Sequence, residues 1–493
     1  MTDQQSSYRQ IMKATSLFGG VQVFNIIIGI IRSKFVAVLL GPAGMGIMGL
    51  LTSTIAVITS LTNFGLGTSA VKDIAAAFGT GDEKQVSIVI TSFRRMVWMT
   101  GLLGLLATLL LSPWLSQITF GNRNYTLAFI WLSLTLAFNQ LSSGQMVLLQ
   151  GMRKLNFLAK ANLSGSTIGL LVTLPLYFFY GVDGIVPGLI GTSLATMVIS
   201  WYFSRQVKIE KIILSPLQTI KVGKNMLRMG LIISLSGFMS VGASYIVRIF
   251  ISRTGGVEQV GLYNAGFAII NTYVGLIFSA MGTDYYPRLS AVAHDNKLCK
   301  QTINQQTEIA LLILAPILII FLIFIKWVVI LLYSKQFIDV NGMIYWAALG
   351  MFFKACSWAI AFVFLAKGAS KLYFWSELIA NCLLLILNLI GYHFWGLTGL
   401  GISFSISFLL YLVLIYFISK VKFEFNFDHN LIQIFEIQFG LAIAGFLTTK
   451  YITNPFNYIL GVLLICFSVW YSLRELDKRL ELKSIIRNYR NKK

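Results

Sequence analysis

The sequence predicts an all-α polytopic membrane protein, on three observations. Hydrophobic residues make up 56% of the 493 residues and charged residues only 12%, too few charges for a soluble chain of this length. The apolar runs are about 20 residues or longer, the length of a bilayer-spanning helix, whereas strands of outer-membrane barrels need only about 10. Basic residues gather in alternate loops, as the positive-inside rule requires. We therefore expect about 14 transmembrane helices.

The apolar runs follow one another with short outward turns and longer, basic inward loops. They are expected to begin near residues 14, 43, 96, 125, 159, 184, 227, 257, 308, 341, 372, 397, 431 and 456. The first run is not read as a cleaved signal peptide, because it is too long, contains two cations and leads straight into the next run. No outward segment is long enough to fold as a catalytic domain, so we do not expect an enzyme.

The formal net charge of +21 could indicate a nucleic-acid partner. The positions of the charges argue against it, because most of the 39 lysine and arginine residues lie in the inward loops and tails. Only Arg123, Arg253, Lys335 and Lys450 lie in outward turns. This asymmetry predicts that both termini are cytoplasmic. The four cysteines and three histidines show no metal-ligand or catalytic spacing, so no catalytic residue, metal or cofactor is predicted.

Glycines and short motifs recur at nearly one separation, which predicts an internal repeat. Gly261 follows Gly46 by 215 residues (261 − 46), and GLTGL at 396–400 follows GVDGI at 181–185 by the same separation. GASKLYF at 368–374 matches GMRKLNF at 151–157 at a separation of 217 (368 − 151). Arg248 falls 216 residues after Arg32 (248 − 32).

An even number of predicted spans separates equivalent positions, so the two copies run in the same sense through the membrane. Such repeats are related by an axis along the membrane normal and bind substrate between them near the midplane. We therefore divide the chain into a six-helix lobe at 1–212, a second six-helix lobe at 213–420, and two extra helices with a basic cytoplasmic tail at 421–493.

Four cations inside predicted spans are the candidate site. A cation near the bilayer centre costs roughly 2.5–3.5 kcal/mol on insertion scales, so such residues usually face protein or water. Lys354 is the strongest candidate because it lies in the middle of its span; the competing interpretation is an ion pair with Glu377. Lys34 and Arg32 are two residues apart and cannot both face one cavity squarely. Arg248, near Arg253, could instead reach the outer surface.

Cations in both lobes would suit a diphosphate, since arginine donates bidentately and lysine acts as a point charge. Amides at mid-span in the fourth run could contact a glycan, or could be interhelical hydrogen bonds: Asn139, Gln140 and Gln145. Glu377 and Asp284 are the acids available for ion coupling, although no buried pair of acids demands it.

Four segments resemble Wzx-type polysaccharide flippases of the multidrug/oligosaccharidyl-lipid/polysaccharide exporter superfamily, in particular the O-antigen and lipid III translocases. They are IIRSKFVAVLLGPAGMGIMG at 30–49, SYIVRIFISRTGGVEQVGLYNAG at 244–266, TDYYPRLS at 283–290 and MFFKACSWAIAFVFLAKG at 351–368. The resemblance covers roughly residues 10–420 and implies a MATE-like pair of six-helix lobes. Lys34, Arg248 and Lys354 match its intramembrane cations, whereas Arg32 has no match.

The resemblance implies alternating-access transport of an undecaprenyl-diphosphate-linked oligosaccharide, such as an O-antigen repeat unit, from the cytoplasmic to the periplasmic leaflet of the bacterial inner membrane. The expected partners are this lipid-linked oligosaccharide, membrane lipids, and a polysaccharide polymerase and chain-length regulator, with no nucleic acid. The alternative is a cation-coupled multidrug or metabolite antiporter of the same superfamily. A cationic drug would need acids in the cavity rather than Lys34, Arg248 and Lys354.

Overall fold

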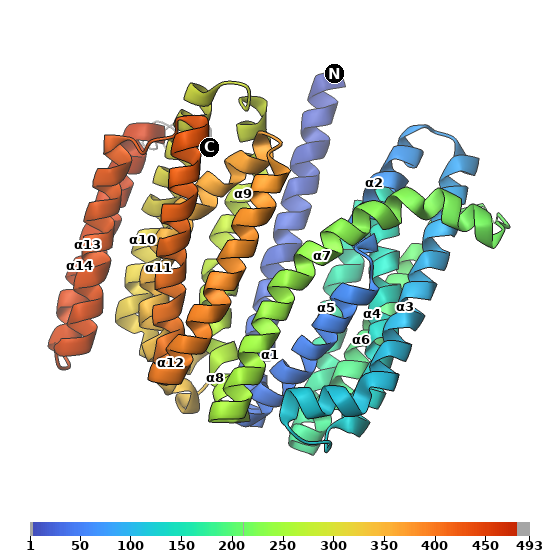
Figure 1. Cartoon of the computed structure of the whole chain (residues 1–493), viewed down its shortest axis with the longest axis horizontal. Helices are drawn as coiled ribbons and strands as arrows, with labels where there is room; N and C mark the ends of the chain where they lie inside the picture. Colours follow the sequence, from blue (N-terminus) through green and yellow to red (C-terminus); the bar gives the residue numbers. More distant parts are fainter. Residues whose placement is uncertain (1–2, 211, 481–493) are drawn as a thin grey trace, which may run out of the picture. The chain divides into compact units, whose positions relative to one another are not determined.

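The computed structural model describes residues 3–210 and 212–480, and every regular element in these ranges is helical (Figure 1). The elements are α1 Asp3–Thr62, α2 Leu66–Gly79, α3 Glu83–Phe120, α4 Thr126–Gly151, α5 Leu155–Tyr180, η1 Gly181–Gly184, α6 Ile185–Arg205, α7 Pro216–Gly255, α8 Val257–Ala268, η2 Ile269–Val274, α9 Leu276–Ala291, α10 Asn296–Leu332, η3 Lys335–Val340, α11 Asn341–Ala366, α12 Ser370–Phe423, α13 His429–Tyr451 and α14 Phe456–Leu480. The all-α prediction is confirmed.

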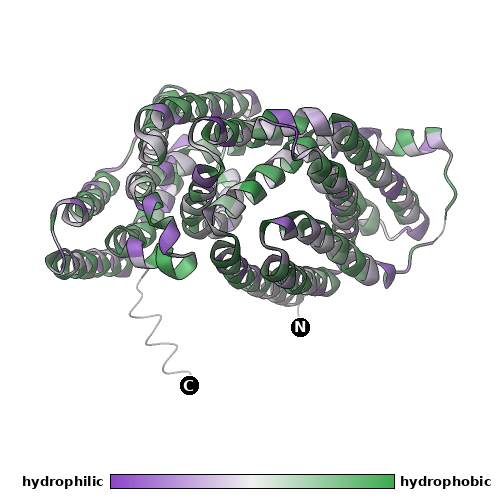
Figure 2. Ribbon diagram, turned by 90° about the horizontal axis from the view of Figure 1, so that it is seen from below, coloured by the Kyte–Doolittle hydropathy of each residue, from purple (hydrophilic) through white to green (hydrophobic). Residues whose placement is uncertain are grey.

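The helices have the surface of a membrane protein. Large apolar side chains such as Leu110, Phe179 and Leu331 are about three-quarters exposed, at 73%, 75% and 74%. Figure 2 shows hydrophobic residues along most of the helical ribbon. A soluble protein rarely exposes so much apolar surface, whereas a helix that is apolar all round is stable in lipid.

Nine helical segments among the described residues are long and apolar enough to cross a membrane. Three of them contain two runs each, divided at Gly41, at η1 and at Gly396. The number of runs is therefore compatible with the fourteen expected. The basic tail expected at the C-terminus lies mostly outside the described residues.

The chain packs as two compact units, residues 1–261 and 262–493. The packing boundary therefore falls after α7, whereas the repeat places α7 at the start of the second lobe. The division into 1–212, 213–420 and 421–493 stays a prediction about the repeat.

Hydrogen bonds attach the N-terminal end of α7 to the first unit. Ser215 caps α7 in a reciprocal capping box with Gln218, and Pro216 occupies the first turn. Arg95 of α3 donates to the Leu214 carbonyl (2.5 Å), immediately before the cap. The start of α7 is thereby fixed against α3.

The middle and the C-terminal end of α7 are attached in the same way. Ser234 donates to the carbonyl of Ser60 in α1. The hydroxyl of Tyr245 lies 2.6 Å from the hydroxyl of Thr119 in α3, and both residues are buried. Arg253 donates to the carbonyl of Ile118 (2.9 Å) at the end of α3. These contacts explain why α7 packs with the first unit.

The backbone confirms a repeat separation of 215 residues. Gly41, at the break in α1, has φ 65° and ψ −172°, and Gly256, between α7 and α8, has φ 88° and ψ 169°. Gly181 and Gly396 both have φ 55°, with ψ −128° and −138°. Only glycine adopts these conformations readily, which is why glycine occupies both members of each pair.

The separation of 217 for the G-x-x-K-L-x-F motif is wrong by two residues. The left-handed residue in the first copy is Arg153 (φ 54°) and in the second it is Gly368 (φ 69°), again 215 apart. The hydrogen bonds that close the two turns show the same separation of 215 residues. Lys154 N–H donates to the Leu149 carbonyl and Ala369 N–H donates to the Phe364 carbonyl, both at 2.8 Å. At this separation Arg248 corresponds to Ser33, one residue from the Arg32 with which it was paired.

Candidate functional site

Lys354 lies near the middle of α11 and has a neutral partner. Its ammonium donates to Asn271 Oδ1 at 2.9 Å. The ion pairs found among the described residues do not include it, so the expected alternative, a pair with Glu377, is not formed. A charged group in low-dielectric surroundings is costly unless a compensating group is present, and an amide oxygen compensates it only in part.

Aromatic rings complete the surroundings of this ammonium. The centroids of Phe278, Phe404 and Phe408 lie 5.9, 5.7 and 5.2 Å from Nζ. The electron-rich faces of such rings attract a cation within about 6 Å. Four elements thus meet at Lys354: α11 carries it, η2 supplies Asn271, α9 supplies Phe278, and α12 supplies Phe404 and Phe408.

Asn271 belongs to a π-helical turn, the only element of that type among the described residues. Single π-helical turns are rare within α-helices and are frequent at functional sites. The Nδ2 group of Asn271 is buried and has no hydrogen-bond partner in the structure. The amide therefore retains an unused donor directly beside the lysine.

Arg32 and Lys34 diverge, as their spacing predicts. Arg32 approaches α5, with Nη2 3.0 Å from the place that a Cβ on Gly169 would occupy. Its Nε is buried and has no hydrogen-bond partner within the described part of the chain. Asn25, two turns earlier on the same face of α1, accepts a hydrogen bond from Ser166 of α5 (2.8 Å). Lys34 is half-buried and on a different face. The structure thus places the Arg32 side chain against α5.

Arg248 lies on α7, half-buried, and its Nη1 donates to the carbonyl of Ser244 one turn earlier (3.0 Å). Because α7 packs with the first unit, Arg248 shares a unit with Arg32 and Lys34, whereas Lys354 lies in the second unit. Convergence of Lys34, Arg248 and Lys354 on one chamber stays a prediction.

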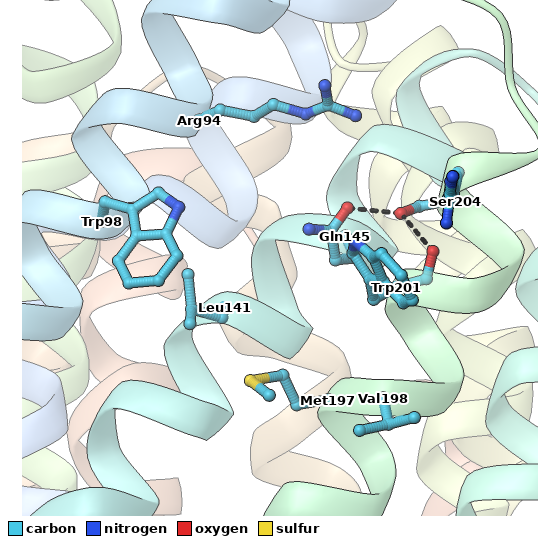
Figure 3. A pocket seen from close by; sticks show the side chains of 9 residues that line it. Arg94, Trp98, Leu141, Gln145, Met197, Val198, Trp201 and Ser204 are labelled. Atoms are coloured by element: carbon cyan, nitrogen blue, oxygen red, sulfur yellow. Dashed lines mark hydrogen bonds between the residues drawn. The ribbon is translucent and has the colours of Figure 1, made fainter.

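The three amides of α4 point to three different surroundings. Asn139 lines a pocket of about 370 Å³ whose other polar members come from α1, the turn that follows it, α4 and α6: Thr52, Thr59, Ser60, Asn63, Thr135 and Ser193. Gln140 donates to the hydroxyl of Thr100 in α3 (2.8 Å), the interhelical bond considered as its alternative. Gln145 accepts from Ser204 of α6 (2.5 Å) and lines a separate groove (Figure 3). The three residues do not form one site.

The two candidate acids differ in their surroundings. Glu377 is half-buried on α12, where it accepts a hydrogen bond from Tyr411 (2.8 Å). Asp284 on α9 is 83% exposed and lies 3.8 Å from Arg288 in an i,i+4 ion pair. Glu377 is therefore partly shielded, whereas Asp284 is exposed.

Sequence reasoning missed Asn271 as the partner of Lys354, and it missed the three phenylalanines. The interruption of α8–α9 by a π-helical turn has no reliable sequence signal. The spacing of Phe404 and Phe408, one turn apart on α12, could have indicated a shared aromatic face.

The helical fold places this chain in a structural class that includes solved membrane transporters. An inward-facing multidrug resistance MATE family transporter of the MOP superfamily matches with a TM-score of 0.70 at 15% identity, over 83% of this chain and 96% of that one. The lipid II flippase MurJ in an inward closed conformation matches with a TM-score of 0.68 at 15% identity, over 94% and 99%. These similarities establish the fold.

The chain belongs to the family described as "Polysaccharide biosynthesis protein", whose model matches residues 35–341. A curated relative from Shigella flexneri called "Putative O-antigen transporter" is 25% identical over 80% of this chain and 94% of its own length. The "Lipid III flippase" of Escherichia coli (strain K12) is 21% identical over 78% and 92%. The resemblance inferred from the sequence is confirmed.

Proposed function

We propose that this protein is a flippase that moves undecaprenyl-diphosphate-linked oligosaccharide, an O-antigen or related repeat unit, from the cytoplasmic to the periplasmic leaflet by alternating access. The family and the two curated relatives support this substrate class. The fold it shares with a lipid II flippase supports the reaction. The observation in the chain itself that carries the proposal is Lys354, a mid-span cation beside a neutral amide.

A neutral partner suits an anion-binding role. Because Asn271 does not cancel the charge of Lys354, the ammonium keeps its attraction for a diphosphate. The substrate phosphate would replace or share the Asn271 contact, and the free Nδ2 group of Asn271 could donate to a second phosphate oxygen. Lys34, Arg248 and Arg32 are proposed to contribute further positive charge during the cycle.

The glycan needs a polar path because its hydroxyl groups cannot be left unpaired in hydrocarbon. The hydroxyl-rich pocket that contains Asn139 offers one in the first unit. Of the three amides of α4 we therefore retain Asn139 alone as a glycan contact. Glu377 is proposed as the ion-coupling acid, since Asp284 is exposed.

The antiporter alternative is less favoured because drugs exported by cation coupling are mostly cationic. A cation would be repelled by Lys354, whose neighbours among the described residues include no carboxylate. We place the protein in the bacterial inner membrane with both termini cytoplasmic, as a transporter rather than an enzyme. A polysaccharide polymerase and a chain-length regulator are its proposed partners.

The test replaces Lys354 with Ala, Gln or Arg in a host strain that lacks the chromosomal gene. Lys354→Ala and Lys354→Gln should abolish surface glycan and cause lipid-linked oligosaccharide to accumulate in the cytoplasmic leaflet, while Lys354→Arg should retain part of the activity. The matched control is Lys326→Ala, since Lys326 also lies in a long apolar helix but is exposed beside Trp327.

Both measurements are needed, surface glycan by gel and protein in the membrane fraction by immunoblot. Wild-type surface glycan in Lys354→Ala would reject the anion-binding role of this residue. Normal surface glycan in the strain with the gene deleted would reject the flippase proposal as a whole.

A further inference from the structure

A groove on the first unit, separate from Lys354, combines two arginines and two tryptophans. It lies between α3, α4 and α6 and has a volume of about 630 Å³. Its lining residues are Arg94, Trp98, Leu141, Gln145, Met197, Val198, Trp201, Ser204 and Arg205. This volume falls in the range of pockets that hold a small molecule.

The arginines and tryptophans form the same pair on two helices that run in opposite directions. On α3, Trp98 follows Arg94 by four residues, and on α6, Arg205 follows Trp201 by four residues. The guanidinium of Arg205 lies 5.3 Å from the ring centroid of Trp201. Residues four apart share a helix face, so each pair presents a cation and an aromatic ring to the groove together.

The order of the residues gives the groove a polar end and an apolar end. Arg94 is closer than Trp98 to the cytoplasmic end of α3, and Arg205 ends α6 on the same side. Figure 3 shows Arg94 reaching across the top of the groove on the side of Gln145 and Ser204, with Leu141, Met197 and Val198 below. Tryptophan is typical of the depth of lipid headgroups, and cations lie just outside it.

Among the described residues, neither guanidinium group has an acidic partner. Neither arginine takes part in an ion pair with any residue in the described ranges, and no acid lines the groove. Trp98 and Trp201 are 56% and 50% exposed, so the groove opens on the surface that faces lipid. An anionic headgroup would meet complementary charge there.

We propose that this groove binds an anionic phospholipid of the cytoplasmic leaflet, with the phosphate between Arg94 and Arg205 and an acyl chain on Leu141, Met197 and Val198. Basic pockets between transmembrane helices on the cytoplasmic side bind such headgroups. A glycan-bearing lipid fits less well, because Gln145 and Ser204 already hydrogen-bond to each other and leave little for sugar hydroxyls. The proposal does not depend on the flippase activity.

The test measures lipid binding to the purified full-length protein by native mass spectrometry, with phosphatidylglycerol and phosphatidylcholine as probes. The variants are Arg94→Gln with Arg205→Gln, and the doubly conservative Arg94→Lys with Arg205→Lys. Two basic residues near the membrane surface should account for about 30-fold in affinity for the anionic lipid. We expect the glutamine pair to lose that preference for phosphatidylglycerol, and the lysine pair to keep most of it.

The control variant is Arg474→Gln. Arg474 lies 5.4 Å from the ring centroid of Trp470, four residues earlier near the end of α14, so it repeats the arginine–tryptophan pair without the groove. Unchanged phosphatidylglycerol affinity in the glutamine pair, or an equal loss in Arg474→Gln, would overturn the proposal. Elution as a single symmetric peak in size-exclusion chromatography shows that each variant is folded.

A competition experiment separates bulk phospholipid from substrate lipid. Undecaprenyl diphosphate is added to wild-type protein loaded with phosphatidylglycerol. Retention of the phospholipid on the protein supports the proposal. Stoichiometric displacement of the phospholipid would assign the groove to the substrate lipid and reject the proposal.

Discussion

Gly46 and Gly261 contact each other through two equivalent backbone approaches. A Cβ on Gly46 would collide with the carbonyl oxygen of Val257, and a Cβ on Gly261 would collide with the carbonyl oxygen of Pro42. Val257 follows Pro42 by the same 215 residues that separate the two glycines. The same contact is thus made twice, as across a two-fold axis, and small residues permit such close helix packing in membranes.

Alanine at Gly46 or at Gly261 should therefore destabilise the protein, because the added Cβ would collide with a backbone carbonyl group, which cannot move aside as a flexible side chain could. We expect each substitution to lower the free energy of unfolding by about 1–3 kcal/mol. The double variant should lose less stability than the two single variants lose together, because one substitution already opens the shared contact. The measurement is the thermal unfolding midpoint of the purified protein. Gly440→Ala in α13, where a Cβ meets nothing within 4 Å, should not lower it.

Arg153 and Gly368 occupy equivalent turns in the two repeats. Removing the side chain at Arg153 and adding one at Gly368 should therefore change stability in opposite directions. Arg153 adopts φ 54° with a side chain, whereas its counterpart Gly368 adopts φ 69° without one, and a Cβ there would meet nothing within 4 Å. The left-handed region costs a residue with a side chain about 1–2 kcal/mol relative to glycine. Arg153→Gly should therefore raise the thermal midpoint and Gly368→Ala should lower it. Equal midpoints for the two variants would show that the turns are not equivalent.

Asn271→Asp should separate stability from transport. A carboxylate at this position would lie within hydrogen-bond distance of the Lys354 ammonium, where the amide oxygen is now 2.9 Å away. The resulting ion pair should leave the thermal midpoint unchanged or raised, yet it should abolish surface glycan because the charge of Lys354 is cancelled. Asn271→Ser, which keeps a neutral oxygen, should retain more surface glycan. If Asn271→Asp transports normally, Lys354 does not bind the diphosphate.

Arg479 joins α14 to α10 through Glu308. The guanidinium Nε lies 2.6 Å from Glu308 Oε2, and both side chains are largely buried, 22% and 11% exposed. A hydrogen bond to a charged group contributes about 1.5–3 kcal/mol. A double-mutant cycle of Glu308→Gln and Arg479→Gln, followed by thermal midpoint, should show coupling of about this size. Lys478→Gln serves as control, because Lys478 is 55% exposed and its partner Glu475 lies one turn away on α14, so it should change the midpoint little.

The fold could be predicted from the sequence because helix length and the distribution of cations follow directly from bilayer thickness and membrane insertion. The breaks between helices could also be predicted, because the sequence has glycine at Gly41, Gly181 and Gly396. The structure shows that the backbone at these positions adopts conformations that favour glycine. For the site, the sequence predicts only the depth of Lys354 in the membrane, because counting residues places this cation in the middle of its span. Its partner could not be predicted, because the approach of Asn271 depends on a π-helical turn.

The remaining site residues show a second limit of sequence reasoning. Asn139, Gln140 and Gln145 were grouped because they are close in sequence, yet successive helical residues point about 100° apart and so reach different neighbours. The groove arginines Arg94 and Arg205 were counted only as inward-loop cations. Their spacing to Trp98 and Trp201 was the available signal.

The attachment of α7 to α1 and α3 determines where this chain could be divided into co-expressed fragments. A cut in the segment 206–215 would leave the seventh helix bound to the first six through Thr219, Ser234 and Tyr245, although it would be encoded with the other fragment. Reassembly would then depend on capturing α7 from a separate polypeptide. A cut next to Gly256 keeps those hydrogen bonds within one fragment, so the preferred division follows packing and not gene duplication.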